Sequence, residues 1–204
     1  MEHVSLGQAP AERADAARNR KHLLATAREM LAEQGADTLT MDGLAERAGL
    51  GKGTVFRRFG TRAGIFRALL DDTERAFQER VISGPPPLGP GAPPLDRLVA
   101  YGQARVDLLI EHADIARATL DGGQPVPAGS STPLSQLHIR VLLGQLDLGP
   151  ADLDILAVQL TAALDGPLLL YLSAADLAED PARTARRITR GWQDLIRRVA
   201  RSPG

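Results

Sequence analysis

Residues 38–62 read TLTMDGLAERAGLGKGTVFRRFGTR, and this stretch decides the fold of the N-terminal part of the chain. Thr40 is a favourable N-cap, because its hydroxyl can accept a hydrogen bond from the first turn of a following helix. Leu44 and Ala48 then lie on the inward side of a two-turn helix. Gly49 can adopt the positive φ that ends such a helix. The pattern therefore predicts a short helix that stops at a sharp turn.

A second short helix follows this turn. Leu50 is the apolar residue of the turn, and Gly51 can cap the helix that begins after it. Val55 and Phe59 are four residues apart and share the face that can pack on the first helix. Two short helices joined by a tight, glycine-containing turn form the helix-turn-helix pattern, so residues 40–59 are predicted to bind DNA.

The opposite face of the second helix has the composition of a DNA-binding surface. Gly53 and Arg57 stand at its centre. Glycine permits close approach of the backbone, and arginine can bind either guanine or phosphate. The run from 47 to 67 holds six cations and no acidic residue, whereas the whole chain has a net charge of −1. Such a local basic patch indicates a polyanion-binding surface, and the alternative is a solvated charged face.

These features resemble the TetR family of bacterial regulators over residues 18–70. The resemblance rests on a set of small, apolar and aromatic residues: Gly35, Thr40, Leu44, Ala45, Ala48, Gly49, Leu50, Gly53, Thr54, Phe56 and Phe59. It rests also on a cation three positions after Phe59, which is Arg62. It implies that residues 52–59 are the recognition helix and that Thr40, position 56 and position 62 contact phosphate. The residues expected to bind DNA are Thr40, Lys52, Gly53, Thr54, Phe56, Arg57, Arg58 and Arg62.

The chain departs from the family pattern at three positions of this motif. Position 51 is usually a small hydroxyl residue and is Gly here, which removes a possible cap and phosphate contact. Position 56 is often Tyr and is Phe here, so a hydroxyl donor is missing. Arg62 stands where Lys is frequent and keeps the charge. Arg57 and Arg58 are candidates to compensate for the two lost contacts.

The remaining sequence also reads as helices, because no stretch alternates apolar and polar residues as a strand does. Helices are expected over 11–34, 41–48, 52–59, 62–82, 95–120 with an interruption near 112–114, 134–147, 151–174 and 181–201. Six prolines and three glycines exclude a helix from residues 83–94, which leaves a flexible link or a surface loop. The chain is predicted to be all-α, with a helix-turn-helix domain at 11–60, a connecting helix at 61–82, a Pro/Gly-rich loop at 83–94 and a regulatory and dimerisation domain at 95–201.

Composition excludes several classes of function. The chain has no Cys, which rules out disulfides and thiolate metal sites and fits a cytoplasmic location. Residues 155–172 are mostly apolar, but Asp165 near their middle argues against a membrane span. GLGKGT at 49–54 lacks the spacing and the preceding strand of a phosphate-binding Walker loop. No nucleophile elbow, metalloprotease motif or metal-ligand spacing is present, so we expect neither an enzyme nor a metal or cofactor site.

The last two predicted helices indicate self-association. The helix at 151–174 is apolar on several faces, so several of its faces are expected to be buried. In the family, the last two helices pair with their copies in a second subunit as a four-helix bundle, and the resemblance therefore implies a homodimer. The residues expected at its interface are Leu153, Leu160, Leu164, Ile188, Trp192 and Leu195. The arginines of the last helix are expected to form a solvated face.

Family members usually hold an effector inside the C-terminal bundle. We therefore expect a pocket there for a largely apolar small molecule with one or two polar groups. Segments 95–120 and 151–174 are expected to supply its walls, and the loop at 122–133 to act as a gate. The candidate ligand contacts are polar residues on otherwise apolar helices: Tyr101, Arg105, His138, Gln159, Asp165 and Tyr171.

The sequence predicts a homodimeric regulator, in the first place a repressor that leaves a near-palindromic site on double-stranded DNA when a small molecule binds. One alternative is a DNA-binding regulator or architectural protein without small-molecule input, which a sealed apolar C-terminal core would favour. A more distant alternative is a small-molecule-binding protein or enzyme, which a phosphate ligand at residues 49–54 would favour.

Overall fold

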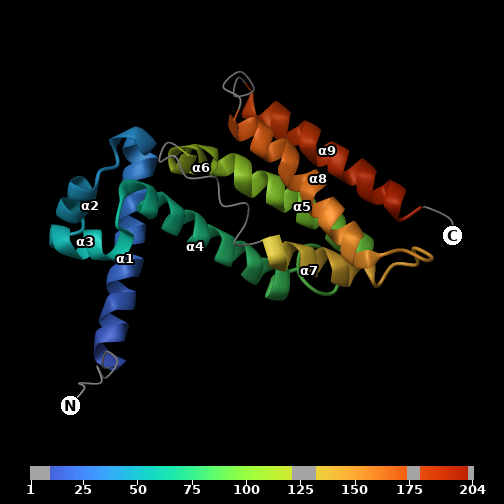
Figure 1. Ribbon diagram of the computed structural model, residues 1–204, viewed down its shortest axis with the longest axis horizontal. Coiled ribbons are helices and arrows are strands. Elements are labelled where there is room, and N and C mark those ends of the chain that lie inside the picture. Colours follow the sequence, from blue (N-terminus) through green and yellow to red (C-terminus); the bar gives the residue numbers. More distant parts are fainter. Residues whose placement is uncertain (1–9, 121–131, 174–179, 202–204) are drawn as a thin grey trace, which may run out of the picture. The chain divides into compact units, whose positions relative to one another are not determined.

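The structure is a computed structural model that describes residues 10–120, 132–173 and 180–201 (Figure 1). Within these residues every element is a helix: α1 (Pro10–Gln34), the 3₁₀ helix η1 (Ala36–Thr38), α2 (Met41–Arg47), α3 (Lys52–Phe59), α4 (Arg62–Ser83), α5 (Pro94–Glu111), α6 (Ala113–Leu120), α7 (Thr132–Leu143), α8 (Leu153–Ser173) and α9 (Pro181–Val199). None of the described helices is long and apolar enough to cross a membrane.

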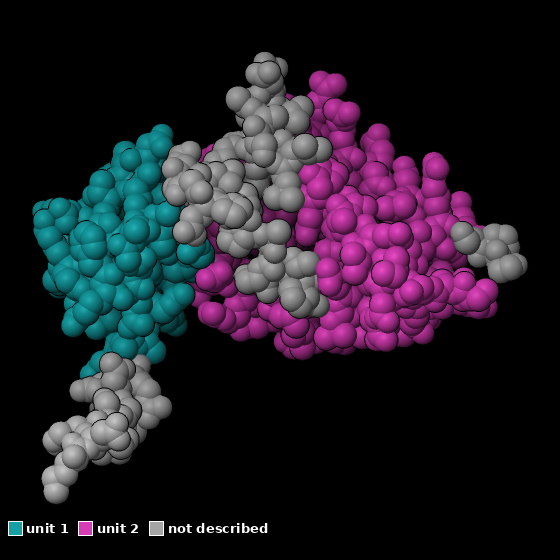
Figure 2. All heavy atoms as spheres, viewed as in Figure 1, with its two compact units in different colours: residues 1–69 teal, residues 70–204 magenta. Residues whose placement is uncertain are grey.

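The chain divides into two compact units, residues 1–69 and residues 70–204 (Figure 2). We call them unit 1 and unit 2. The sequence placed the end of the DNA-binding domain at residue 60 and treated the next helix as a connection. The observed division instead lies within α4, because Ile65, Phe66 and Leu69 are buried side chains of unit 1.

The expected all-α fold is confirmed, and each predicted helix is present within a few residues of its expected bounds. The expected interruption lies at His112, whose φ of −108° and ψ of 18° separate α5 from α6. The short helix η1 was not predicted, because three residues are too few to show a helical period.

Unit 1 has a core of apolar side chains from α1, α2, α3 and α4, together with Leu39. α2 packs on α3 and on α1. The ring nitrogen Nε2 of His22 in α1 lies 3.0 Å from the carbonyl oxygen of Ala48, which ties α1 to the end of α2. The buried apolar residues are Leu23, Leu24, Ala27, Met30, Leu39, Leu44, Ala45, Ala48, Val55, Ile65, Phe66, Ala68 and Leu69.

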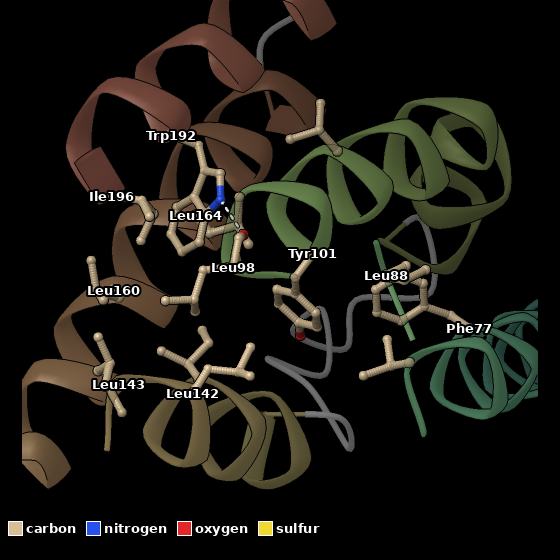
Figure 3. Close-up of a cluster of buried hydrophobic side chains, with 14 residues drawn as sticks. Phe77, Leu88, Leu98, Tyr101, Leu142, Leu143, Leu160, Leu164, Trp192 and Ile196 are labelled. Carbon is tan, nitrogen blue, oxygen red and sulfur yellow. Dashed lines mark hydrogen bonds between the residues drawn. The ribbon is translucent and has the colours of Figure 1, made fainter. Parts of the chain in front are cut away.

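Unit 2 has a larger core, part of which Figure 3 shows. α5 packs mainly on α9, and α7 packs mainly on α8. Side chains from α4, α5, α7, α8 and α9 meet in one cluster, whose buried members are Phe77, Val81, Leu88, Leu98, Tyr101, Val106, Ile139, Leu142, Leu143, Ala157, Leu160, Leu164, Trp192 and Ile196. A core shared in this way fixes the helices of unit 2 relative to one another.

The contact between α5 and α9 depends on a glycine. The indole Nε1 of Trp192 donates a hydrogen bond of 2.8 Å to the carbonyl oxygen of Leu98 (Figure 3). The ring lies directly over Gly102, where an added Cβ would stand 2.0 Å from Nε1. Any side chain larger than hydrogen at position 102 would therefore displace the indole.

The Pro/Gly-rich stretch packs on unit 2 as a surface loop, which decides between the two interpretations of the sequence. Leu88 is buried in the core cluster of this unit. Pro93 precedes α5, and Pro94 is its first residue, where the missing N–H has no partner to lose. The prolines thus stop α4 and start α5.

Candidate DNA-binding surface and a buried polar cluster

The helix-turn-helix forms as its sequence predicts. The Thr40 side chain accepts a hydrogen bond of 3.0 Å from the backbone N–H of Gly43 and so caps α2. Gly49 has a φ of 64°, a conformation that glycine adopts without strain. Gly51 is the N-cap of α3 and provides no side-chain hydrogen bond. The backbone N–H groups at the start of α3 therefore lack a side-chain acceptor, which suits binding of a phosphate.

α3 presents nearly all of its residues to solvent. Val55 is its buried residue and anchors the helix in unit 1. Gly53 has no heavy atom within 4 Å of an added Cβ, so the surface above it is open. Phe56 is 50% exposed, and Arg57 is also exposed. A protruding helix with an exposed aromatic ring, a glycine and cations has the form of a major-groove reader.

The cations of this region differ in what they contact within the chain. Arg57 makes only a long hydrogen bond of 3.5 Å, from Nη2 to the hydroxyl of Thr54. Arg58 donates from Nη2 to the carbonyl oxygen of Ala16, at 2.8 Å. Exposed Lys52 lies 2.8 Å from a carboxylate oxygen of Asp42, an ion pair that contributes little in water. Arg57 is therefore the most available side chain for a base or phosphate.

Two cations of the acid-free run have structural roles that the sequence did not predict. Arg47 forms two hydrogen bonds of 2.6 Å with the carboxylate of Glu33, and these bonds lower the pKa of Glu33. Both groups stand on the surface of unit 1, and their pairing joins α2 to α1. The charge of Arg47 is therefore offset within the chain, and it adds little to a basic patch.

Arg62 was expected to contact phosphate, but its guanidinium forms hydrogen bonds with backbone carbonyls of unit 1. Nε donates to the carbonyl oxygen of Leu39 at 2.8 Å, and Nη2 donates to that of Ala36 at 2.6 Å. The guanidinium carbon also lies 5.0 Å from the ring centroid of Phe66. Arg62 thus holds η1 against the start of α4. No local pattern could reveal this role, because the acceptors are backbone carbonyls more than twenty residues away.

Unit 2 contains a cluster of polar side chains within its apolar core. The hydroxyl of Tyr101 donates to the hydroxyl of Ser135 at 2.6 Å, and both residues are buried. The ring of His138 lies 5.0 Å from that of Tyr101, between centroids. Burial raises the pKa of Tyr101, and burial together with the charge of Arg97 lowers the pKa of His138 to about 4. Tyr101 and His138 are therefore neutral near pH 7.

Charged groups complete the cluster. Arg105 is 6% exposed, and its guanidinium pairs with the carboxylate of Glu74. Its Nε lies 3.8 Å from a carboxylate oxygen of Asp165. Burial alone would lower the pKa of Arg105, but the negative charges of Glu74 and Asp165 raise it, so the group stays positive. Burial raises the pKa of Asp165. One cation is thus held between two carboxylates from α4 and α8.

Four of the six expected ligand contacts come together in this cluster: Tyr101, Arg105, His138 and Asp165. Gln159 does not join them, because it is exposed on α8. The side chain of Tyr171 and residues 122–131 of the expected gate at 122–133 lie outside the described residues. Sequence reasoning missed Ser135 and Glu74, which complete the hydrogen bond and the ion pair. No group of three or more His, Asp or Glu side chains in the described part of the chain could hold a metal ion.

A hollow in the surface of unit 2 does not lie where a pocket was expected. It has a volume of about 280 Å³ and lies between the Pro85–Pro87 turn and the face of α5 that carries Gln103 and Asp107. The expected walls were α5 and α8. Leu98, Leu160 and Leu164 are buried in the core cluster to which α5 and α8 both contribute.

The residues expected at a dimer interface require a correction. Leu160, Leu164 and Trp192 are buried in the core of their own subunit and offer no surface to a partner. Leu153, Ile188 and Leu195 are partly buried and pack against the same core. The sides of α8 and α9 that carry Leu160, Leu164 and Trp192 therefore face the interior of the unit, whereas an interface role for the three partly buried residues stays a prediction.

Comparison with known proteins agrees with this geometry. Residues 23–69 match the model of the family described as bacterial regulatory proteins, tetR family. The fold is similar to that of a TetR-family transcriptional regulator from Pectobacterium atrosepticum, at 22% identity and a TM-score of 0.74, covering 94% of this chain and 99% of that chain. It is also similar to a TetR transcriptional regulator from Streptomyces coelicolor, at 27% identity and a TM-score of 0.53, covering 87% and 97%. No curated protein matches the chain in sequence.

The capped helix-turn-helix, its exposed cationic face and the all-α fold define a DNA-binding regulator. Residues 23–69 are thus similar to the TetR family in sequence, and the chain shares its fold with TetR-family transcriptional regulators.

Proposed function

We propose that the protein is a homodimeric repressor that binds a near-palindromic operator through α3 and leaves it when a small molecule binds in unit 2. Two copies of α3 would read successive major grooves of double-stranded DNA, with Gly53 and Arg57 nearest the bases. The effector would be largely apolar with one or two polar groups.

The observation that carries the effector proposal is the buried polar cluster of unit 2. An ion pair and a hydroxyl pair inside a core contribute less to stability than apolar residues of the same volume, since each group loses water. Such groups are often present because they recognise something. Tyr101, His138 and Asp165 offer a hydroxyl, a neutral imidazole and a carboxylate that a ligand could bind in place of their present neighbours.

Release from DNA would follow from differential binding. A ligand that binds one arrangement of unit 2 more tightly than another shifts the population toward that arrangement, by no more than the difference in affinity. By the same linkage, operator DNA must weaken ligand binding by the factor with which the ligand weakens DNA binding. The coupling can therefore be measured from either side.

The test begins with selection of bound sequences from random DNA, followed by a thermal-shift screen of apolar compounds against the full-length protein. A compound that binds the folded state raises the midpoint, and it should also release the selected DNA. Tyr101→Phe and His138→Phe should abolish the ligand response and leave DNA affinity unchanged. Gln103→Ala, on the exposed side of α5, is the matched control. If operator binding is specific but no compound affects it, the regulator without small-molecule input is the better account.

A further inference from the structure

The hollow in the surface of unit 2 is walled on one side by a rigid turn. Pro85, Pro86 and Pro87 form this wall, and the ring of each proline fixes its φ. The backbone N–H of Gly89 donates a hydrogen bond of 3.0 Å to the carbonyl oxygen of Pro85, which closes the turn. Leu88 is buried in the core cluster and holds the turn on unit 2. The wall is therefore formed before any ligand binds, and little entropy is lost in ordering it.

The floor of the hollow is one face of α5. Ala100, Ala104 and Asp107 follow each other at spacings of four and three, so they share this face. The two alanines are partly buried and, together with the prolines, give the hollow an apolar lining. Its volume of about 280 Å³ is at the small end of ligand sites. The hollow therefore fits a small metabolite better than a large, drug-sized molecule.

Two opposite charges line the hollow without pairing with each other. Arg80 lies near the end of α4 and Asp107 lies on α5, and both side chains are exposed. Neither forms an ion pair or a side-chain hydrogen bond with any residue that the structure describes. Their charged atoms are thus farther apart than in an ion pair, which leaves room for a ligand between them.

A zwitterion can satisfy both charges at once. The carboxylate of a free amino acid can accept hydrogen bonds from the Arg80 guanidinium, whose donors form a fork that matches a carboxylate. The ammonium group of the same molecule can donate to the Asp107 carboxylate. An apolar side chain would then cover the prolines and alanines and remove their surface from water. A ligand with a single charge would leave one of the two protein charges without a partner.

We propose that the hollow is a second small-molecule site, and that it binds a free α-amino acid with an apolar side chain. None of its lining residues belongs to the buried polar cluster in which the effector is proposed to bind. The hollow gives unit 2 a second chemical input. Because Arg80 lies on α4 and Asp107 on α5, the bound amino acid joins these two helices and stabilises the folded state.

L-phenylalanine and two analogues that each lack one charge test the proposal. A ligand of about a dozen non-hydrogen atoms has a dissociation constant on the order of 1 mM, which isothermal titration calorimetry on the full-length protein can measure. Phenethylamine lacks the carboxylate and phenylpropionate lacks the ammonium group, so each should bind about tenfold more weakly than L-phenylalanine. Equal affinity for the three compounds, or no binding of either L-phenylalanine or L-leucine, would overturn the proposal.

Two substitutions assign each charge of the ligand to its partner. Arg80→Gln should weaken L-phenylalanine about tenfold and change phenethylamine less than about twofold, because phenethylamine has no carboxylate to lose. Asp107→Asn should weaken L-phenylalanine by a similar factor and spare phenylpropionate. Both side chains are exposed, so the fold should not change. Arg75→Gln on α4 and Asp96→Asn on α5, which are exposed and lie outside the hollow, are the matched controls and should leave the affinity unchanged.

Tyr101→Phe and His138→Phe distinguish this site from the proposed effector site. Both variants alter the buried polar cluster and should leave the binding of L-phenylalanine unchanged. If they abolish this binding, the amino acid binds in the cluster, which overturns the site in the hollow and supports the proposed effector site. If Arg80→Gln and Asp107→Asn act no more strongly than their controls, the site in the hollow is overturned and the proposed repressor is unaffected.

Discussion

Gly102→Ala tests whether the close contact of α5 and α9 holds unit 2 together. In a helix this exchange ordinarily stabilises, because alanine loses less backbone entropy than glycine, by about 0.5–1 kcal/mol. At position 102 the new Cβ would lie 2.0 Å from the indole Nε1 of Trp192. The indole is 3% exposed and rigid, so the ring or a helix must move.

The expected loss of stability follows from two costs and one gain. Overpacking of a core costs about 1–3 kcal/mol. Movement of the indole breaks its hydrogen bond to Leu98 and leaves a buried donor without a partner, which costs about 1–3 kcal/mol. After subtraction of the helix-propensity gain, Gly102→Ala should lower the free energy of unfolding by about 1–5 kcal/mol.

Gly191→Ala is the control, because this glycine is also interior to a helix but has no heavy atom within 4 Å of an added Cβ. It should stabilise the protein by about 0.5–1 kcal/mol. Urea unfolding can be followed by circular dichroism and by the fluorescence of Trp192, the single tryptophan of the chain. In the double variant with Trp192→Phe, part of the loss should be recovered. If Gly102→Ala and Gly191→Ala changed the free energy of unfolding equally, the close contact at Gly102 would contribute nothing to stability, and the reasoning would be refuted.

The remaining predictions concern charge. Burial lowers the pKa of His138 to about 4 in the folded chain. The same side chain in the unfolded chain has its ordinary pKa near 6.5, so between these two pH values the unfolded chain binds a proton and the folded chain does not. Stability should therefore fall between about pH 6.5 and pH 4, by on the order of 2 kcal/mol after allowance for partial exposure, and His138→Phe should lack this component in urea titrations at several pH values. Arg105→Met should lower the free energy of unfolding by about 3–5 kcal/mol, because it leaves the Glu74 carboxylate buried without its partner. A smaller loss in the same urea titrations would show that this ion pair is not a buried pair of the core. Arg57→Ala should weaken operator binding by about 1–3 kcal/mol with unchanged stability, measured by fluorescence anisotropy. Arg62→Ala should lower stability by about 1–3 kcal/mol through its two lost carbonyl partners, and a variant as stable as wild type would contradict that role.

The helix-turn-helix could be predicted because its determinants are local. Thr40 caps, Gly49 turns and Val55 faces inward for reasons contained within a few residues of each. The role of Arg62 could not be predicted, since its acceptors are carbonyls of η1 and its neighbourhood. A motif therefore identifies a surface better than it assigns each side chain on that surface.

In unit 2 the sequence showed which residues are apolar but not what covers them. Leu160 and Trp192 have the spacing of an interface and of a core alike, and the structure places both in the core. Gln159 and Asp165 are both polar residues on an apolar helix, yet one is exposed and the other approaches Arg105. A helix that is apolar all round has no sequence signal that distinguishes its sides.

The exposure of α3, the proposed recognition helix, has one consequence for how regulators of this fold diverge. Of its eight residues Val55 is the buried one, and Thr54 and Phe59 are partly buried, so the exposed Lys52, Gly53, Phe56 and Arg57 can change with little effect on folding. Exposed substitutions away from caps and buried pairs usually alter stability by less than about 0.5 kcal/mol. A single exchange at position 53 or 57 could therefore redirect the protein to another DNA sequence before any compensating change elsewhere. Related chains can in this way retain one fold while the DNA sequences that they bind, and hence the genes that they control, become different.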